Sequence, residues 1–171
     1  MNNNIPTIVI SGFAGTLVAE PGGAIASSLR KYYGKNIKII ALAYDALGNS
    51  VYTAGLVDAI YLIKPLSHSI EEHYHELSRV FNICKPDIYI PALELEVKYL
   101  RYFIDRFKRN GIKALVPDID ILERVSKLSL HYFCQDFGFP HPTTSVTKTA
   151  AEFRYALDGF RLPCLIKSYL C

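Results

Sequence analysis

Short apolar runs alternate with amphipathic segments along the first two thirds of the chain. Between the apolar runs, apolar residues recur every three to four positions, the spacing of a helix with one buried face. Near-continuous apolar strands joined by helices predict a parallel sheet covered on both faces. We therefore expect an α/β domain over residues 1–116, with five strands at residues 7–11, 37–44, 59–63, 87–91 and 113–116.

Capping signals mark two of the helix starts. Ser69 with Glu72, and Thr149 with Glu152, have the S/T-x-x-E spacing of a capping box. The apolar periodicity predicts helices over residues 23–33, 70–81, 97–107, 117–138 and 150–158.

The pattern changes after Pro117. A long helix is expected to reach Gly138, and the segment 138–142 to be extended, because each of its prolines disfavours helix at the residue before it. Residues 143–147 and 162–167 then read as two further strands. These 55 or so residues carry too little apolar surface for a core of their own. These residues either pack against the first domain or form the beginning of a second domain whose remaining residues are absent from this sequence. We favour the second interpretation.

Composition excludes several classes of protein. The 171 residues are 50% hydrophobic and have a net charge of +3, which excludes intrinsic disorder. The four cysteines form no CxxC pair and the five histidines no metal spacing, so reduced thiols are expected rather than a metal site. With no signal peptide and no apolar run of about 18 residues, we expect a cytoplasmic protein without a membrane partner.

One basic stretch, residues 101–109, raises the question of nucleic acid. Phenylalanines recur in it at helical spacing, which favours an amphipathic helix with a solvated basic face. We therefore expect no nucleic-acid partner.

Glycines gather between the first strand and the first helix. Gly12 and Gly15 follow the strand, and Gly22 and Gly23 precede the helix. Glycines there allow a tight turn and a close approach to a ligand, with helix N–H groups facing an anion. A role in the turn alone and a ligand role stay equally open. A bound dinucleotide is less favoured, because the spacing is not G-x-G-x-x-G.

Acidic residues follow two of the expected strands. Asp45 stands where dinucleotide folds bind a ribose, although a solvated turn acid explains it better. Glu94 and Glu96 follow the fourth strand, and ligands of open parallel sheets bind beyond the carboxyl ends of the strands. Glu94 is therefore a candidate for substrate binding. Glu96 fits a helix start, where the helix dipole favours negative charge.

The order of five segments resembles an enzyme family. The segments are the glycine loop, DIYIPALELE, ERVSKLSLHYF, GFPHPTT and LPCLIK. Together they resemble the N-terminal portion of an ATP-grasp enzyme of the biotin carboxylase and carbamoyl-phosphate synthase large-subunit type, over essentially the whole chain. The resemblance implies a Rossmann-like preATP-grasp domain at 1–116. It also implies a linker helix and an incomplete α+β ATP-grasp subdomain at 117–171.

The resemblance implies an ATP site. Lys127 and Lys167 match the two lysines with which the family reaches bound ATP, although Ser126 replaces the usual aspartate before the first. A polyphosphate needs fixed cationic partners, so the two ammonium groups are expected to point into a common cleft.

In the family, ATP activates a carboxylate as an acyl-phosphate, which a nucleophile then attacks. ATP and Mg²⁺ are therefore the implied cofactors of the intact protein, and a small-molecule carboxylate is its implied substrate. Gly12, Gly15 and Glu94 are the tentative substrate contacts. The family's glycine-rich phosphate loop and its metal ligands follow the segments matched here. We therefore expect no metal ligand in this chain and no activity from the chain alone. The resemblance leaves room for a partner chain that completes the ATP-grasp domain.

Two other classes stay open. The glycine loop and Asp45 allow an NAD-type dinucleotide-binding domain. An incomplete second part that pairs with a partner chain would instead make a non-catalytic interaction module. For the lysines, the plain alternatives are an exposed helix lysine at Lys127 and an edge-strand lysine that prevents aggregation at Lys167.

Overall fold

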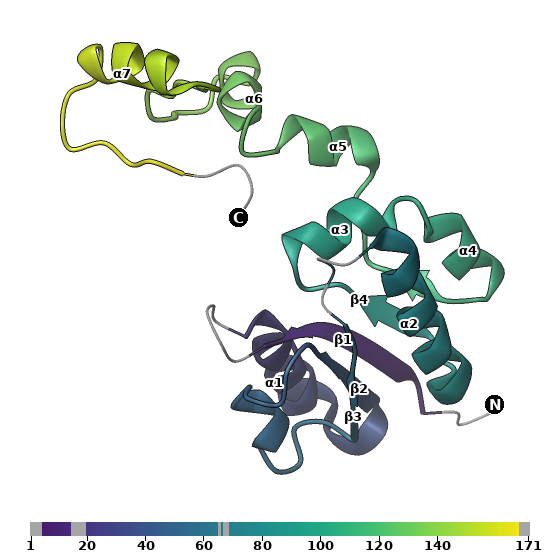
Figure 1. The fold of residues 1–171 in the computed structure, drawn as a ribbon. Coiled ribbons are helices and arrows are strands. Elements are labelled where there is room, and N and C mark those ends of the chain that lie inside the picture. The colour runs from purple at the N-terminus through teal and green to yellow at the C-terminus, as the bar shows by residue number, and fades with distance from the viewer. Residues whose placement is uncertain (1–4, 15–19, 65, 67–68, 168–171) are drawn as a thin grey trace. The chain divides into compact units, whose positions relative to one another are not determined.

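A computed structural model describes residues 5–14, 20–64, 66 and 69–167 (Figure 1). Contacts divide the chain into two units, Met1–Pro117 and Asp118–Cys171. The first unit contains a five-stranded sheet in which every neighbouring pair is parallel, in the order β3-β2-β1-β4-β5. The strands are β1 Thr7–Phe13, β2 Lys38–Ala43, β3 Ala59–Leu62, β4 Ile88–Ile90 and β5 Lys113–Ala114. The expected open parallel sheet is confirmed.

This strand order fixes where a ligand can bind. The chain moves from β1 outward through β2 to β3, and then returns to place β4 on the other side of β1. The order therefore reverses between β1 and β4. In open α/β sheets the ligand crevice lies at this switch point, outside the carboxyl ends of the strands.

Helices cover both faces of the sheet. Ile8 and Ile10 of β1 belong to a core that contains Ala26 of α1, whereas Val9 belongs to a second core with Leu77 of α2. Successive strand residues point to opposite faces, so a strand buried on both sides must be apolar throughout. The helices of this unit are α1 Pro21–Tyr33, α2 Ile70–Cys84, α3 Glu94–Leu100 and α4 Ile104–Arg109, with short 3-10 turns η1 Gly34–Asn36 and η2 Ser50–Tyr52.

The capping signal at α2 is confirmed, but the helix expected over 97–107 is divided. Ser69 Oγ accepts a hydrogen bond of 3.0 Å from the N–H of Glu72. A turn separates α3 from α4, and there the N–H of Phe103 bonds to the carbonyl of Leu100 at 2.9 Å. The turn brings Phe103 onto α2, where its ring stacks on Tyr74 with 4.5 Å between centroids. Burial of the Phe103 ring against α2 therefore stabilises the fold more than the backbone hydrogen bonds of one continuous helix would.

The described residues of the second unit, 118–167, contain three short helices, α5 Ile119–Arg124, α6 Leu130–Asp136 and α7 Ala150–Asp158. The long helix expected here is interrupted between α5 and α6, where Ser129 Oγ lies 2.6 Å from Ser126 Oγ and also donates to the carbonyl of Glu123. Serine hydroxyls that bond to nearby backbone in this way compete with helix. The predicted start of α7 is confirmed, because Thr149 Oγ1 accepts from the N–H of Glu152 at 3.2 Å.

The strands expected at 143–147 and 162–167 are not formed; both segments have irregular backbone. A strand needs a neighbour that pairs with its N–H and C=O groups, and no other strand is described in this unit. None of the described residues from 120 to 167 is buried. Leu162, Leu165 and Ile166 are 77%, 80% and 69% exposed.

This difference in burial predicts a difference in proteolysis. We expect brief digestion with trypsin to cut first in the irregular segments of the second unit, after Lys148 and Arg161, because local opening there disrupts no buried core. The fragment that contains the sheet should persist. Intact-mass spectrometry of the first products checks this, and an early cut between β1 and β4 would contradict it.

Candidate functional site

Polar side chains meet at the carboxyl ends of β1, β2 and β4. Glu96 in the first turn of α3 is fully buried. Its carboxylate accepts hydrogen bonds from the hydroxyls of Ser11 in β1 and Tyr44 directly after β2, and from the N–H of Leu93 at 3.2 Å. We refer to Ser11, Tyr44 and Glu96 as the Glu96 cluster. It joins the two sides of the switch point.

A bulge in β1 places Ser11 in this cluster. The pairing of β1 with β2 shifts register between Ile10 and Phe13. Val9 lies in the core under α2, but Phe13 lies in the core under α1, so the alternation of side chains changes within this stretch. Ser11 Oγ donates to Glu96 and accepts from the N–H of Ala92 at 2.9 Å.

Close packing explains the glycines at the end of β1. Gly12 has φ +78°, and a Cβ there would lie 2.9 Å from the Cβ of Ala92 and 3.2 Å from Cγ of Pro21. A Cβ on Gly22 would lie 2.2 Å from the carbonyl oxygen of Ser11. The first turn of α1 therefore packs directly on the end of β1.

The atoms that crowd Gly12 are atoms of the protein and not of a ligand. These contacts show that Gly12 has a role in packing. Its expected contact with substrate stays a prediction. Gly15, the second expected contact, lies outside the described residues.

The two glutamates after β4 have different surroundings. Glu94 is exposed at the start of α3 and pairs with Lys98 Nζ at 3.1 Å, one helical turn away. Glu96 occupies the third position of the helix and accepts from the N–H of its N-cap, so the expected helix-start role of Glu96 is confirmed. The sequence did not reveal the long-range bonds that Glu96 makes to Ser11 and Tyr44. A substrate contact for Glu94 stays a prediction.

Burial changes the acidity of Glu96. Desolvation raises the pKa of its carboxyl group to about 7, although hydrogen bonds from Ser11 and from the N–H of Leu93 act in the opposite direction. Because no part of Glu96 is exposed, it cannot touch a ligand in this arrangement. Its effect on a ligand is indirect, through the position of the strand ends.

Two further acids bind backbone around the same end of the sheet. Asp45 Oδ1 accepts from the N–H of Leu47 at 2.8 Å, which is a turn bond and supports the turn explanation of Asp45. Glu20, directly before α1, accepts from the N–H of Ser50 at 2.9 Å. This bond ties the start of α1 to the connection between β2 and β3.

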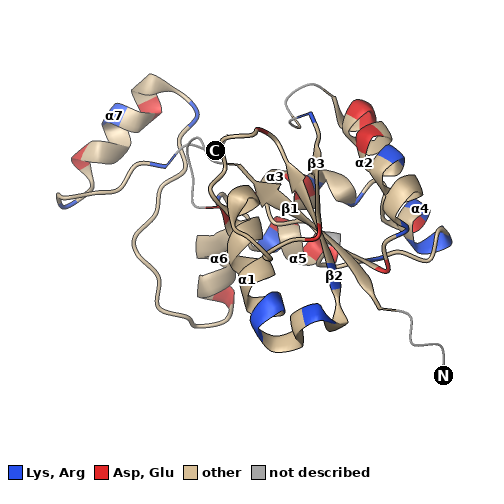
Figure 2. Cartoon of the chain, turned by 90° about the horizontal axis from the view of Figure 1, so that it is seen from below, with Lys and Arg blue, Asp and Glu red and all other residues tan. Residues whose placement is uncertain are grey.

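The two predicted ATP-binding lysines lie in the second unit. Lys127 is exposed in the turn between α5 and α6 rather than within a helix. Lys167 is exposed at the end of an irregular segment, and not on a strand that would aim it into a cleft. Their shared nucleotide site stays a prediction. Figure 2 shows acidic and basic segments on the same helices in α2 and α4.

The residues that the structure describes contain neither a metal-binding cluster nor a membrane-spanning helix. In that part of the chain no group of three or more His, Cys, Asp or Glu side chains is arranged to hold a metal ion. None of the helices described is long and apolar enough to cross a membrane.

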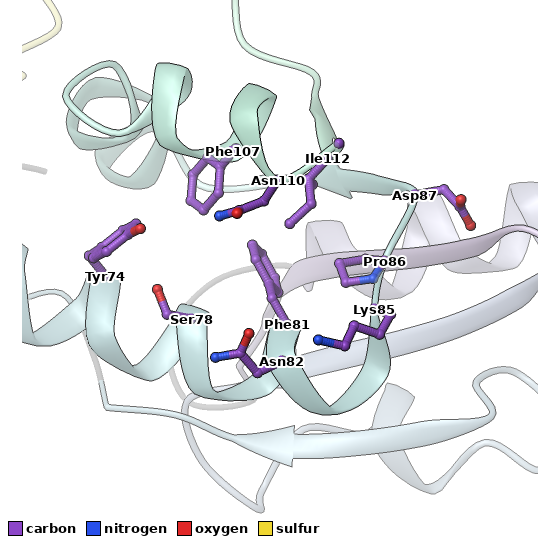
Figure 3. Close-up of a pocket in the computed structure, with 11 residues that line it drawn as sticks. Tyr74, Ser78, Phe81, Asn82, Lys85, Pro86, Asp87, Phe107, Asn110 and Ile112 are labelled. Carbon is purple, nitrogen blue, oxygen red and sulfur yellow. The ribbon is translucent and has the colours of Figure 1, made fainter.

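A pocket of about 480 Å³ lies at the opposite end of the sheet, before β4 and β5 (Figure 3). The side chains of Phe81 and Phe107 form part of its wall, and those of Ser78, Asn82 and Asn110 supply polar groups. None of the candidate residues expected from the sequence lines this pocket. Because it lies at the amino ends of the strands, the pocket is not where ligands of open parallel sheets usually bind.

No model of a known protein family matches the sequence, and no curated protein is significantly similar to it. Solved structures share its fold. A biotin carboxylase domain of a single-chain bacterial carboxylase has TM-score 0.55 and 17% identity, over 90% of this chain and 34% of that one. The biotin carboxylase domain of Hydrogenobacter thermophilus 2-oxoglutarate carboxylase, solved with MgADP, ADP and bicarbonate, has TM-score 0.54 and 15% identity, over 91% and 33%. Rhizobium etli pyruvate carboxylase has TM-score 0.51 and 18% identity, over 82% and 13%.

The first unit is thus an α/β domain with an open parallel sheet and its switch point between β1 and β4. More particularly, the chain has the fold of the N-terminal region of a biotin carboxylase domain. The resemblance drawn from the sequence is confirmed at the level of the fold. The chain spans about a third of the length of these two biotin carboxylase domains and 13% of the length of the pyruvate carboxylase.

The raised pKa of Glu96 predicts how stability depends on pH. The folded protein keeps a proton on Glu96 up to about pH 7, whereas the unfolded chain releases it near pH 4.5. The free energy of unfolding should therefore fall as pH rises from about 4.5 to about 7, by about 3 kcal/mol. Glu96→Gln cannot ionise and should lack this loss. Urea unfolding at a series of pH values measures it.

Glu94→Gln is the matched control, because Glu94 is exposed two residues away. It should keep the pH profile of the unmodified chain. If Glu96→Gln also keeps that profile, the assignment of the raised pKa to Glu96 is wrong.

The crowding at Gly12 predicts a second stability effect. Gly12→Ala adds a methyl group against Ala92 and Pro21 and should lower the free energy of unfolding by about 3 kcal/mol. Gly111→Ala is the control, since Gly111, directly after the C-cap of α4, has φ +75° with no atom within 4 Å of an added Cβ. It should cost only about 1 kcal/mol. Equal losses in the two variants, measured by urea unfolding, would show that crowding at Gly12 has no effect.

Proposed function

We propose that the chain is the N-terminal part of an ATP-dependent ligase of the biotin carboxylase type, which activates a small carboxylate. The observation that carries this proposal is the shared fold with two biotin carboxylase domains over 90% and 91% of the chain. The order of the five sequence segments agrees with it.

In this proposal the first unit helps to hold the substrate at its switch point. The Glu96 cluster fixes the ends of β1 and β2 relative to α3. Glu94 is exposed on the first turn of the same helix and is the proposed substrate contact. Gly12, in β1, and Gly15 are proposed as further contacts with the substrate.

The second unit contributes the first cations of the nucleotide site. Lys127 and Lys167 are both exposed, and a pair of ammonium groups suits the phosphates of ATP. ATP would supply the phosphoryl group that activates the carboxylate. The described residues offer no cluster of metal ligands, so in this proposal Mg²⁺ is held by residues of the intact protein outside them.

The proposal requires that residues 162–167 pair as a strand in the intact protein. Leu162, Leu165 and Ile166 are largely exposed, as expected of an apolar strand without its neighbours. The same exposure supports a second candidate function, an interaction module in which a partner chain covers this segment without catalysis.

Activity assays distinguish these functions. The 171-residue chain alone should show no Mg²⁺-dependent ATP hydrolysis with bicarbonate or another small carboxylate. A protein that joins the chain to the coding sequence that follows it should hydrolyse ATP if that sequence supplies a glycine-rich strand and metal ligands. Lys167→Ala should lower the rate of the joined protein about 100-fold. ADP release in a coupled assay measures each rate.

Lys148→Ala is the control for Lys167→Ala, because Lys148 is an exposed lysine in the same unit with no proposed contact to ATP. It should leave the rate unchanged. Turnover by the 171-residue chain alone, abolished by Lys167→Ala, would contradict the incomplete site. Tight binding of NADH in place of ATP, detected by its fluorescence, would favour the dinucleotide-binding alternative.

A further inference from the structure

The amino ends of the strands form the end of the sheet opposite the switch point. Each connection that leads into β2, β3, β4 or β5 brings the chain back to this end, because all the strands are parallel. We refer to the residues of these connections, 30–38, 53–58, 84–87 and 108–113, as the basic end. They hold eight of the 19 Lys and Arg residues of the chain but only two of its 16 Asp and Glu residues.

The two acids of the basic end are already bonded within the protein. Asp58 pairs with Arg30 at 2.7 Å and accepts from the N–H of Ile39, and Asp87 accepts from the N–H of Thr7 at 2.7 Å. Seven exposed cations remain, and in the part of the chain that the structure describes none of them forms an ion pair: Lys31, Lys35, Lys38, Lys85, Lys108, Arg109 and Lys113. The basic end therefore has an excess of positive charge.

Helix stability explains only some of these cations. A cation in the last turn of a helix interacts favourably with the helix dipole, which accounts for those at the ends of α1 and α4. Lys35, Lys38 and Lys113 lie beyond the α-helices. Lys38 begins an interior strand, where no sheet edge needs protection from aggregation. An anionic partner accounts for the cations that the helices do not explain.

The cations extend across the sheet. Lys38 begins β2 and Lys113 begins β5, and these strands are separated by β1 and β4. With neighbouring strands about 4.8 Å apart, β2 and β5 lie about 15 Å apart. Figure 2 shows blue segments at the end of α1, at the start of β2 and on α4. A chain of phosphates, with one charge on each nucleotide, can contact cations over this width, whereas one small anion cannot.

Two exposed tyrosines lie among the cations. Tyr32 and Tyr33 end α1 and are 81% and 45% exposed, with Lys31 before them and Lys35 after them in the sequence. The ring centroids of the two tyrosines are 4.7 Å apart, in an edge-to-face arrangement. Exposed aromatic rings beside cations are surfaces on which unpaired bases stack. The bases of a duplex are already stacked on each other, so this feature favours a single strand.

We propose that the basic end binds single-stranded nucleic acid. Its lysines and Arg109 bind the phosphates, and the ring of Tyr32 stacks on a base. The expectation of no nucleic-acid partner considered residues 101–109 alone. The cations of the basic end come from three separate stretches of sequence, which only the fold brings together. This binding goes beyond the proposed ligase function and does not depend on it.

The surroundings of the cations favour nucleic acid over other anionic partners. An acidic peptide would bind the cations but make no use of exposed aromatic rings. An anionic membrane is bound through an apolar face as well as through cations. The aliphatic residues Ile37, Leu56 and Ile112 of the basic end are buried, and Ile5 and Ile83 beside it are single exposed residues. The basic end therefore lacks a broad apolar face.

The test is a fluorescence-anisotropy titration of the full chain with labelled oligo-uridine and oligo-thymidine, each about 16 nucleotides long. Binding of either oligonucleotide supports the proposal, and binding of neither at low salt overturns it. The logarithm of the association constant should fall by about 0.7 per unit of the logarithm of salt concentration for each phosphate contacted. Tighter binding of a duplex of the same length would show that stacking has no part, and would also overturn the proposal.

Two variants separate charge from stacking. Lys35→Gln combined with Lys113→Gln should weaken binding and reduce the salt slope by about 1.4, because two phosphate contacts are lost. Tyr32→Ala should weaken binding about tenfold without changing the salt slope, because it removes one stacking surface and no charge.

Matched controls lie in the second unit. Lys148→Gln combined with Arg154→Gln removes two exposed cations, and Tyr155→Ala removes a tyrosine that is 85% exposed. Both controls should leave affinity unchanged. If they weaken binding as much as the variants of the basic end do, the contact is not at the basic end and the proposal is wrong.

A membrane is tested with vesicles of phosphatidylserine and phosphatidylcholine. Binding of the chain to these vesicles, without binding to either oligonucleotide, would assign the basic end to a membrane and overturn the proposal. None of these measurements uses ATP, so a failure of the proposed ligase function would leave their results unchanged.

Discussion

The buried carboxyl group of Glu96 holds together strand ends that the sheet alone leaves unsupported. Beyond Ile10 the regular ladder between β1 and β2 breaks, and β4 ends after Ile90. Hydroxyl groups from Ser11 and Tyr44 and the N–H of Leu93 converge on the carboxylate where this regular pairing stops. A buried carboxyl is costly unless it is hydrogen-bonded, so the arrangement depends on all its donors being in place.

That dependence explains the local sequence around β1. The bulge orients Ser11, and the positive φ of Gly12 lets the backbone make it. The absence of a Cβ on Gly12 then lets β1 approach Ala92 closely enough for Ser11 Oγ to accept its N–H. Serine, glycine and glutamate therefore act as one structural unit, although Ser11 and Glu96 are 85 positions apart.

The sheet was predictable because its signal is local, whereas the Glu96 cluster was not. Strands buried on both faces must be apolar, and the five apolar runs each overlap a strand of the sheet. Glu94 and Glu96 look equivalent in the sequence, since both stand at a helix start after β4. Only the fold decides that Glu96 points to Ser11 and Tyr44 while Glu94 pairs with Lys98 at the surface.

The errors in secondary structure have a related cause. Residues 143–147 and 162–167 have the composition of strands, but β propensity expresses packing against neighbours more than a backbone preference. No neighbouring strand is described for these two segments, so their β propensity does not produce a strand. In the divided helices, side-chain contacts replace helical backbone bonds that the apolar periodicity alone predicts. The contact is that of Phe103 with α2 in the first case and that of Ser129 with Ser126 in the second.

The strand order also separates the switch point from the β3 edge of the sheet. The switch point lies between β1 and β4, and the β3 edge is separated from it by the whole of β2. With neighbouring strands about 4.8 Å apart, the edge lies about 10 Å from β1. The Glu96 cluster takes its members from β1, from the end of β2 and from α3. The support of the switch point therefore involves no residue of β3, and the edge strand can vary without disturbing the buried carboxyl group.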